Sequence, residues 1–111
     1  MKLDNIGELI ATRTLMLLQD GGSSLEVLVL LGKPQQLPDH SDYYCPYQIK
    51  GVGSEKVRYV CGVDPFQALL LALSSIGVEL EVFNKELGGK LRWECGEKKG
   101  VGIPAIHPSL L

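Results

Sequence analysis

The sequence lacks a cysteine framework. Its 111 residues include three cysteines, and no two of them form a CxxC pair. An odd number of widely spaced thiols is typical of a reducing compartment and not of a disulfide-stabilised secreted domain.

Long apolar runs are also missing. The longest lies within residues 68–73, whereas a membrane-spanning helix needs about 20 mostly apolar residues. Residues 1–8 have no apolar stretch behind a basic head, so they do not resemble a signal peptide. We therefore expect a soluble, cytoplasmic protein with no membrane partner.

There is no excess of positive charge. The chain has 11 Lys and Arg against 13 Asp and Glu, which gives a formal net charge of −2. Proteins that bind nucleic acid through its phosphates are usually basic, so we expect no nucleic-acid partner. The rest of the composition is ordinary for a globular protein, with 45% hydrophobic and 22% charged residues. This length predicts a single domain over residues 1–111.

The strongest local pattern is a helix that starts after residue 64. Asp64 is a natural N-cap, Pro65 suits the first helical position, and Gln67 can bond back to the cap. Apolar residues then recur at spacings of three and four, and Leu70 and Ala72 widen the stripe. Its members are Phe66, Leu69, Leu73, Ile76, Leu80 and Phe83. Gly77 could end the helix, but the stripe continues beyond it, so we predict that the helix continues too.

Five segments have the composition and alternation of β-strands. They are Leu9–Leu18, Leu25–Leu31, Tyr43–Ile49, Lys56–Cys61 and Leu91–Cys95. Pro46 within the third segment indicates a sheet edge or a bulge. The order β-β-β-β-α-β predicts an α+β fold, in which one main helix packs on one face of an antiparallel sheet of about five strands.

The last three strands alternate, so each should bury one face. The faces predicted to be buried carry Tyr43, Cys45, Tyr47 and Ile49, then Val57, Tyr59 and Cys61, then Leu91, Trp93 and Cys95. The first two strands are apolar on both faces, as Leu28 and Leu30 illustrate. One helix covers one side only, so the tail 103–111, a second copy or another protein should cover the other side. Leu28 and Leu30 are therefore candidate partner-binding residues.

The long segment 33–42 is a second candidate for binding. It leads into Tyr44 and carries Asp39 and Asp42, which would suit a basic partner. Tyrosines are common at the energetic centres of protein interfaces. The alternative is that these carboxylates are simply solvated, and that Tyr43 and Tyr47 belong to the core.

No set of residues indicates catalysis. Cys45, Cys61 and Cys95, with His40 or His107, are numerous enough for a zinc site but lack the paired spacing of zinc ligands. Buried cysteine behaves as a small hydrophobe. We predict no catalytic residue, no metal and no cofactor.

Several short segments carry a resemblance to a known family. They are Cys45-Pro46-Tyr47-Gln48-Ile49, Gly51-Val52-Gly53, residues 62–69, Leu71-Ala72-Leu73, Ile76-Gly77, Trp93 and Gly102-Ile103-Pro104. With these segments the sequence resembles a family of small uncharacterised bacterial proteins, a domain of unknown function, over residues 12–104. The resemblance supplies no catalytic residues. It implies, by association with other small bacterial domains, an immunity protein of a toxin–immunity pair.

The leading hypothesis is therefore a non-enzymatic, protein-binding module of the bacterial cytosol, and specifically an immunity protein that masks a toxin domain. The alternative is a homodimeric accessory domain that pairs through its first two strands. A third class is a small-ligand-binding or enzymatic domain with its site between helix and sheet.

Overall fold

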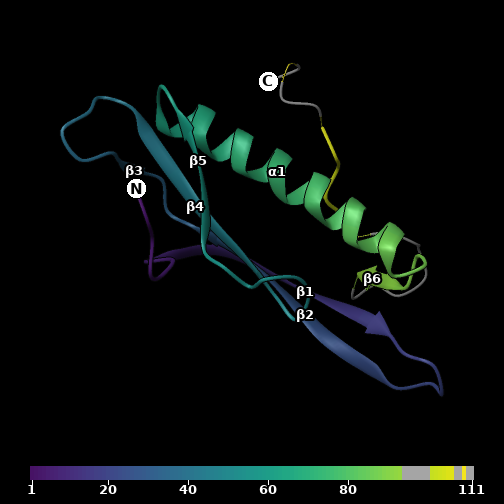
Figure 1. Ribbon diagram of the computed structural model, residues 1–111. Coiled ribbons are helices and arrows are strands. Elements are labelled where there is room, and N and C mark those ends of the chain that lie inside the picture. The colour runs from purple at the N-terminus through teal and green to yellow at the C-terminus, as the bar shows by residue number, and fades with distance from the viewer. Residues whose placement is uncertain (94–100, 107–108, 110–111) are drawn as a thin grey trace.

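The computed structural model describes residues 1–93, 101–106 and 109. They form an antiparallel sheet and one helix, which confirms the predicted α+β class (Figure 1). The strands are β1 (Leu9–Leu18), β2 (Ser24–Gly32), β3 (Gln35–Gln36), β4 (Tyr43–Lys50), β5 (Arg58–Gly62) and β6 (Leu91–Trp93), and the helix is α1 (Pro65–Glu86). Residues 94–95 of the predicted last strand lie outside the described residues.

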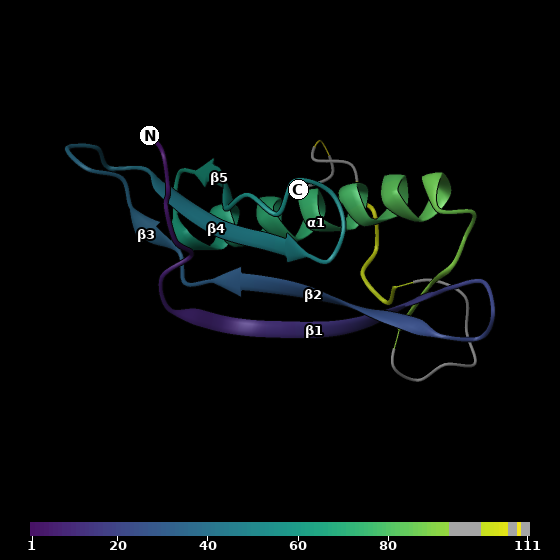
Figure 2. The same cartoon turned by 60° about the horizontal axis from the view of Figure 1, so that its bottom comes forward.

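The sheet is a meander of β1, β2, β4 and β5, and the last strand, β6, pairs with the outer edge of β1. Its order is β5–β4–β2–β1–β6, and every pairing is antiparallel. Helix α1 lies across one face of the sheet (Figure 2). It carries the chain from β5 at one edge to β6 at the other (Figure 1). The short strand β3, which the sequence did not predict, continues the line of β2 beside β4.

Pro46, which predicted either a sheet edge or a bulge, lies where the strand register beside β4 changes between β2 and β3. Leu31 of β2 pairs with Tyr47, but Gln35 of β3 pairs with Tyr44, so the register moves by one residue between them. The Pro46 ring fills this gap against Gly32, where an added Cβ would lie only 2.6 Å from Cγ of Pro46. Because β4 has neighbours on both sides, the alternative of a sheet edge is wrong. The extra residue of the register change lies opposite Pro46, in residues 32–34, and not in β4 itself.

The core lies between α1 and the face of the sheet that it covers. Alternate residues of each long strand enter it, as the period of two requires. The buried members from the sheet are Leu15, Leu17, Val27, Val29, Leu31, Cys45, Tyr47, Ile49 and Leu91. The predicted inward face of β4 is thus confirmed.

The start of α1 follows the predicted capping pattern with one difference. Asp64 accepts a hydrogen bond from the Gln67 backbone N–H at 2.8 Å, and Pro65 occupies the first turn. The Gln67 side chain accepts from the N–H of Val63, which is one residue before the cap. The helix continues through Gly77 to Glu86, as predicted.

The face of α1 that enters the core differs from the predicted stripe. Ala68, Ala72, Ile76 and Leu80, spaced four residues apart, are at most 1% exposed. Small side chains at 68 and 72 let the helix backbone approach the sheet closely, and this turns the bulky Phe66 outward. Phe66 is 77% exposed, and Leu70 and Leu73 are exposed too. Their assignment to the core is therefore wrong.

The length and apolar composition of α1 would also allow it to cross a membrane. Core helices of soluble proteins have the same properties, and one face of α1 packs on the sheet. The observation is therefore weak evidence for a membrane span.

The C-terminal segment crosses α1 at Gly77. An added Cβ there would collide with the Pro104 carbonyl, which explains a glycine in the middle of the helix. The Ser74 hydroxyl donates to the Ile106 carbonyl, and Val101 and Ile103 join the core on the helix side. Within its described residues, this segment does not cover the second face of the β1–β2 hairpin, which was one of the predicted possibilities.

Part of that second face is covered by the N-terminal segment. Ile6 packs at Gly32, where an added Cβ would meet its carbonyl at 2.9 Å and its side chain at 3.1 Å. The Tyr59 hydroxyl donates to the Met1 carbonyl at 3.0 Å. Residues 1–8, for which the sequence predicts neither helix nor strand, therefore pack along the back of the sheet.

The predicted buried face of β5 is wrong. Cys61 is exposed, whereas Val60 packs against the core and Gly62 is buried. Gly62 allows β5 to approach the first turn of α1, because an added Cβ would collide with the backbone of Ala68. This close contact brings Val60 inward and leaves Tyr59 on the back of the sheet.

Candidate functional site

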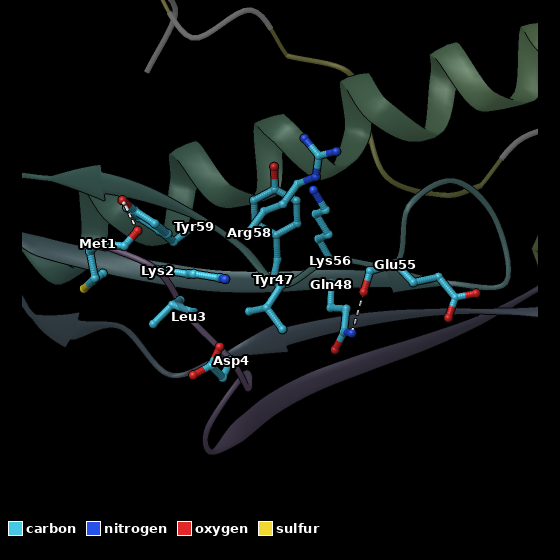
Figure 3. Close-up of a pocket in the computed structure, with 11 residues that line it drawn as sticks. Met1, Lys2, Leu3, Asp4, Tyr47, Gln48, Glu55, Lys56, Arg58 and Tyr59 are labelled. Carbon is cyan, nitrogen blue, oxygen red and sulfur yellow. Dashed lines mark hydrogen bonds between the residues drawn. The ribbon is translucent and has the colours of Figure 1, made fainter.

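Three hollows meet at Tyr47 of β4 and Arg58 of β5. The first, of about 730 Å³, is bordered by residues 1–4, by Gln48 and by residues 55–59. The second, of about 620 Å³, lies between β5 and the Val78–Val82 side of α1. The third is small, about 20 Å³, and reaches Glu79 and Phe83. In the close-up of the first hollow, Tyr47 and Arg58 both point toward α1 (Figure 3).

Tyr47 is the buried centre of this region. It is only 5% exposed, and burial together with the neighbouring Glu79 carboxylate raises its pKa far above the usual value of a phenol. Arg58 and the Ser75 hydroxyl act in the opposite direction on this pKa. The phenol therefore stays protonated and can donate a hydrogen bond over the whole physiological range.

Glu79 is the acidic member of the same cluster. Its Oε1 atom lies 3.5 Å from Nε of Arg58. Its Oε2 atom is buried and has no hydrogen-bond partner of good geometry among the described residues. A buried carboxylate oxygen without a partner is costly, and the Tyr47 hydroxyl is the donor beside it, since a hydrogen bond with Glu79 is one cause of the raised Tyr47 pKa.

A row of apolar side chains is exposed on α1 and just before it. The members are Val63 (67% exposed), Phe66 (77%), Leu70 (44%) and Leu73 (37%), and we call them the Phe66 row. Spacings of three and four place Phe66, Leu70 and Leu73 on one side of the helix.

The partner-binding residues predicted from the loop lie at one end of the sheet. Asp39 is exposed and has a positive φ of 54°. Asp42 donates its backbone N–H to Nδ1 of His40 at 3.1 Å, and its carboxylate lies 3.8 Å from the same atom. Tyr44 is half-buried and packs edge-to-face with Tyr59 at a centroid distance of 6.0 Å.

The two predicted residues of the hairpin face away from α1. Leu28 is half-buried, and Leu30 is only 9% exposed. Leu28 and Leu30 thus share the back of the sheet with Tyr44, while Asp39 and Asp42 lie in the loop between β3 and β4. Their role in binding stays a prediction.

The cysteines do not form a site among the described residues. Cys45 is buried and its thiol donates to the Gly32 carbonyl at 3.5 Å, while desolvation raises its pKa to about 11. Cys61 is exposed, contrary to the prediction, and Cys95 and His107 lie outside the described residues. Within residues 1–93, 101–106 and 109, no three His, Cys, Asp or Glu side chains lie close enough to hold a metal ion.

The sequence did not single out Arg58, Ser75 or Glu79. A signal was present, however, because Ser75 and Glu79 are one turn apart and border the buried positions of α1. Two polar residues beside a helix's apolar face indicate a polar cluster under it. Locating Arg58 required the position of β5 relative to α1.

These features define a small α+β domain with a polar cluster beneath its helix and an apolar row outside it. The chain belongs to the family described as domain of unknown function (DUF6968), whose model matches residues 11–105. No curated protein and no solved structure shows a significant match to it.

Proposed function

We propose that this protein is a non-enzymatic protein-binding module. The observation that supports it is the Phe66 row, whose side chains contribute little to the core of the monomer. A contiguous exposed apolar row on a monomeric domain is typical of an interaction site. Amphipathic helices commonly bind partners through residues at such spacings.

The energetics favour a partner at this row. Full burial of an apolar side chain such as Phe stabilises a complex by roughly 1.5–3 kcal/mol, and aromatic residues dominate many interfaces. Phe66 retains most of its surface in the folded chain, so this free energy is available for binding.

Within this class, we propose the role of an immunity protein that neutralises a toxin domain by masking it. Two features support this role: the acidic net charge of −2 and the exposed Asp39, which would both suit a basic partner. An adjacent gene for a toxin-like protein is expected, and an isolated gene would argue against this role.

The test of the binding function is a pull-down from the native host with the tagged full-length chain. We expect one stoichiometric protein partner, lost with Phe66→Asp and retained with the control Leu25→Asp. Leu25 is a suitable control because it is also exposed, at 53%, but lies in β2 near the hairpin turn. Equal binding by both variants would refute the assignment to the Phe66 row.

The homodimer remains the alternative outcome. Recovery of the chain with only a second copy of itself, and a dimer by light scattering that Leu28→Asp dissociates, would replace the immunity role with pairing through β1 and β2. A clean monomer at high concentration would remove this alternative.

A further inference from the structure

The hollow between β5 and α1 has a chemistry of its own. Its volume is about 620 Å³, and it shares Tyr47 and Arg58 with the hollow that residues 1–4 border. The helix contributes Val78 and, one turn further on, Glu81 and Val82, and all three are exposed. Side chains at such spacings form one surface patch.

The patch combines apolar walls with negative charge. Val78 is 42% exposed and Val82 48%, which leaves room for a hydrocarbon chain to pack between them. Among the charged residues that line the hollow, Glu79 and Glu81 are acidic and Arg58 alone is basic. The lining therefore carries a net charge of −1.

Arg58 already pairs with one of the two carboxylates that line this hollow. Its guanidinium lies 3.5 Å from Oε1 of Glu79, and Oε2 of Glu79 is buried. Glu81 is exposed and has no salt bridge among the described residues. Glu81 is thus the carboxylate of the hollow that is free for a cation, because Glu79 already pairs with Arg58.

We propose that this hollow accepts a lysine or arginine side chain of the protein partner. The methylene stem of such a side chain would pack on Val78 and Val82, and its cationic head would meet the exposed carboxylate of Glu81. This inference rests on the proposed binding function and adds the chemistry of the partner. The hollow and the Phe66 row lie on the same helix, so one partner can contact both.

The test is an NMR titration of the ¹⁵N-labelled full-length chain with Nα-acetyl-arginine amide. We expect saturable shifts of the backbone amides of Val78, Glu79, Glu81 and Val82. Nα-acetyl-citrulline amide, which has nearly the same shape but no charge, should give no saturable shifts. The inference is overturned if citrulline binds equally, if the shifts lie elsewhere, or if arginine amide does not saturate.

A matched pair of variants tests the acidic group. Glu81→Gln should weaken the binding of arginine amide about two- to fivefold, as expected for an exposed ion pair. Glu86→Gln is the control, because Glu86 is also an exposed glutamate of α1 but does not line the hollow. Equal weakening by both variants would show a general charge effect and would refute the site.

The same variants separate this inference from the proposed function. If the native partner is lost with Phe66→Asp but binds Glu81→Gln with unchanged affinity, the function stands and the hollow is not used. If no protein partner is recovered while arginine amide binds in the hollow, the site stands and the proposed function fails.

Discussion

Phe66 and Ile76 lie on the same helix in opposite environments. Phe66 is 77% exposed, whereas Ile76 is 1% exposed and packs in the core. The sequence pattern placed both in one stripe because spacing alone does not fix the rotation of a helix about its axis. The small residues Ala68 and Ala72 fix it, since only they allow the observed close contact with the sheet.

This contrast gives a prediction for stability. Phe66→Ala should change the free energy of unfolding by less than about 1 kcal/mol, because surface substitutions have small effects. Ile76→Ala should lower it by about 2–5 kcal/mol, as is usual for a large side chain removed from a core. Urea unfolding of both variants checks this, and a similar loss in both would place Phe66 in the core after all.

Tyr47 gives a prediction for pH dependence. Its pKa is raised in the folded state by burial and by Glu79. The folded chain therefore holds the phenolic proton more tightly than the unfolded chain, whose tyrosines titrate near pH 10. The stability that this proton contributes is fully present below pH 10 and is lost as the pH rises above it.

The measurement compares wild type with Tyr47→Phe. Between about pH 9.5 and pH 11.5, the free energy of unfolding should fall more steeply for wild type than for the variant. Burial of Cys45 adds a slope of the same sign in both proteins, so it cancels in the comparison. Parallel curves would show that Tyr47 ionises normally in the folded chain.

At the scale of elements, the capping residues and the alternation of the strands made most of the fold predictable. Asp64 and Pro65 marked the start of α1, and β1 has the predicted bounds. The face of β5 was not predictable, because it depends on the close packing of Gly62 against α1, which is a tertiary contact. The polar cluster at Glu79 was missed for the same reason: its members come from three elements.

Gly77 joins two elements and gives a third prediction. In an isolated helix, Gly→Ala stabilises by about 1 kcal/mol. Here the added methyl group would collide with the Pro104 carbonyl, so Gly77→Ala should destabilise the full-length chain. In a chain that ends at Gly102, the same substitution should become stabilising. Thermal unfolding of the four proteins tests this reversal, and the same sign in both backgrounds would exclude the contact.

For the whole molecule, the N-terminal segment closes a surface that the helix cannot reach. Ile6 lies over Gly32, and Met1 accepts the hydrogen bond of Tyr59. The prediction from sequence offered only the C-terminal tail or another chain for this coverage. It overlooked residues 1–8 because they have no regular periodicity.

Removal of residues 2–7 should therefore expose apolar surface on the back of the sheet. We expect stronger binding of a hydrophobic dye and a loss of about 1–3 kcal/mol of stability, which corresponds to one or two partly buried aliphatic side chains. The point variant Ile6→Ser should reproduce part of both effects. Unchanged dye binding and stability would show that the segment does not cover the sheet.

Arg13 connects the first strand of the sheet to Trp93 and to residues 101–102. Its guanidinium stacks on the Trp93 ring at 3.9 Å and donates to the carbonyls of Val101 and Gly102. During synthesis on the ribosome, β1 and β2 emerge well before the carbonyls that Arg13 binds, which lie 88 and 89 residues further along the chain. The outer edge of β1 consequently stays open for most of translation, and an unpaired strand edge favours aggregation. Expression yield of this protein should therefore depend on the speed at which β6 and residues 101–102 are synthesised and docked.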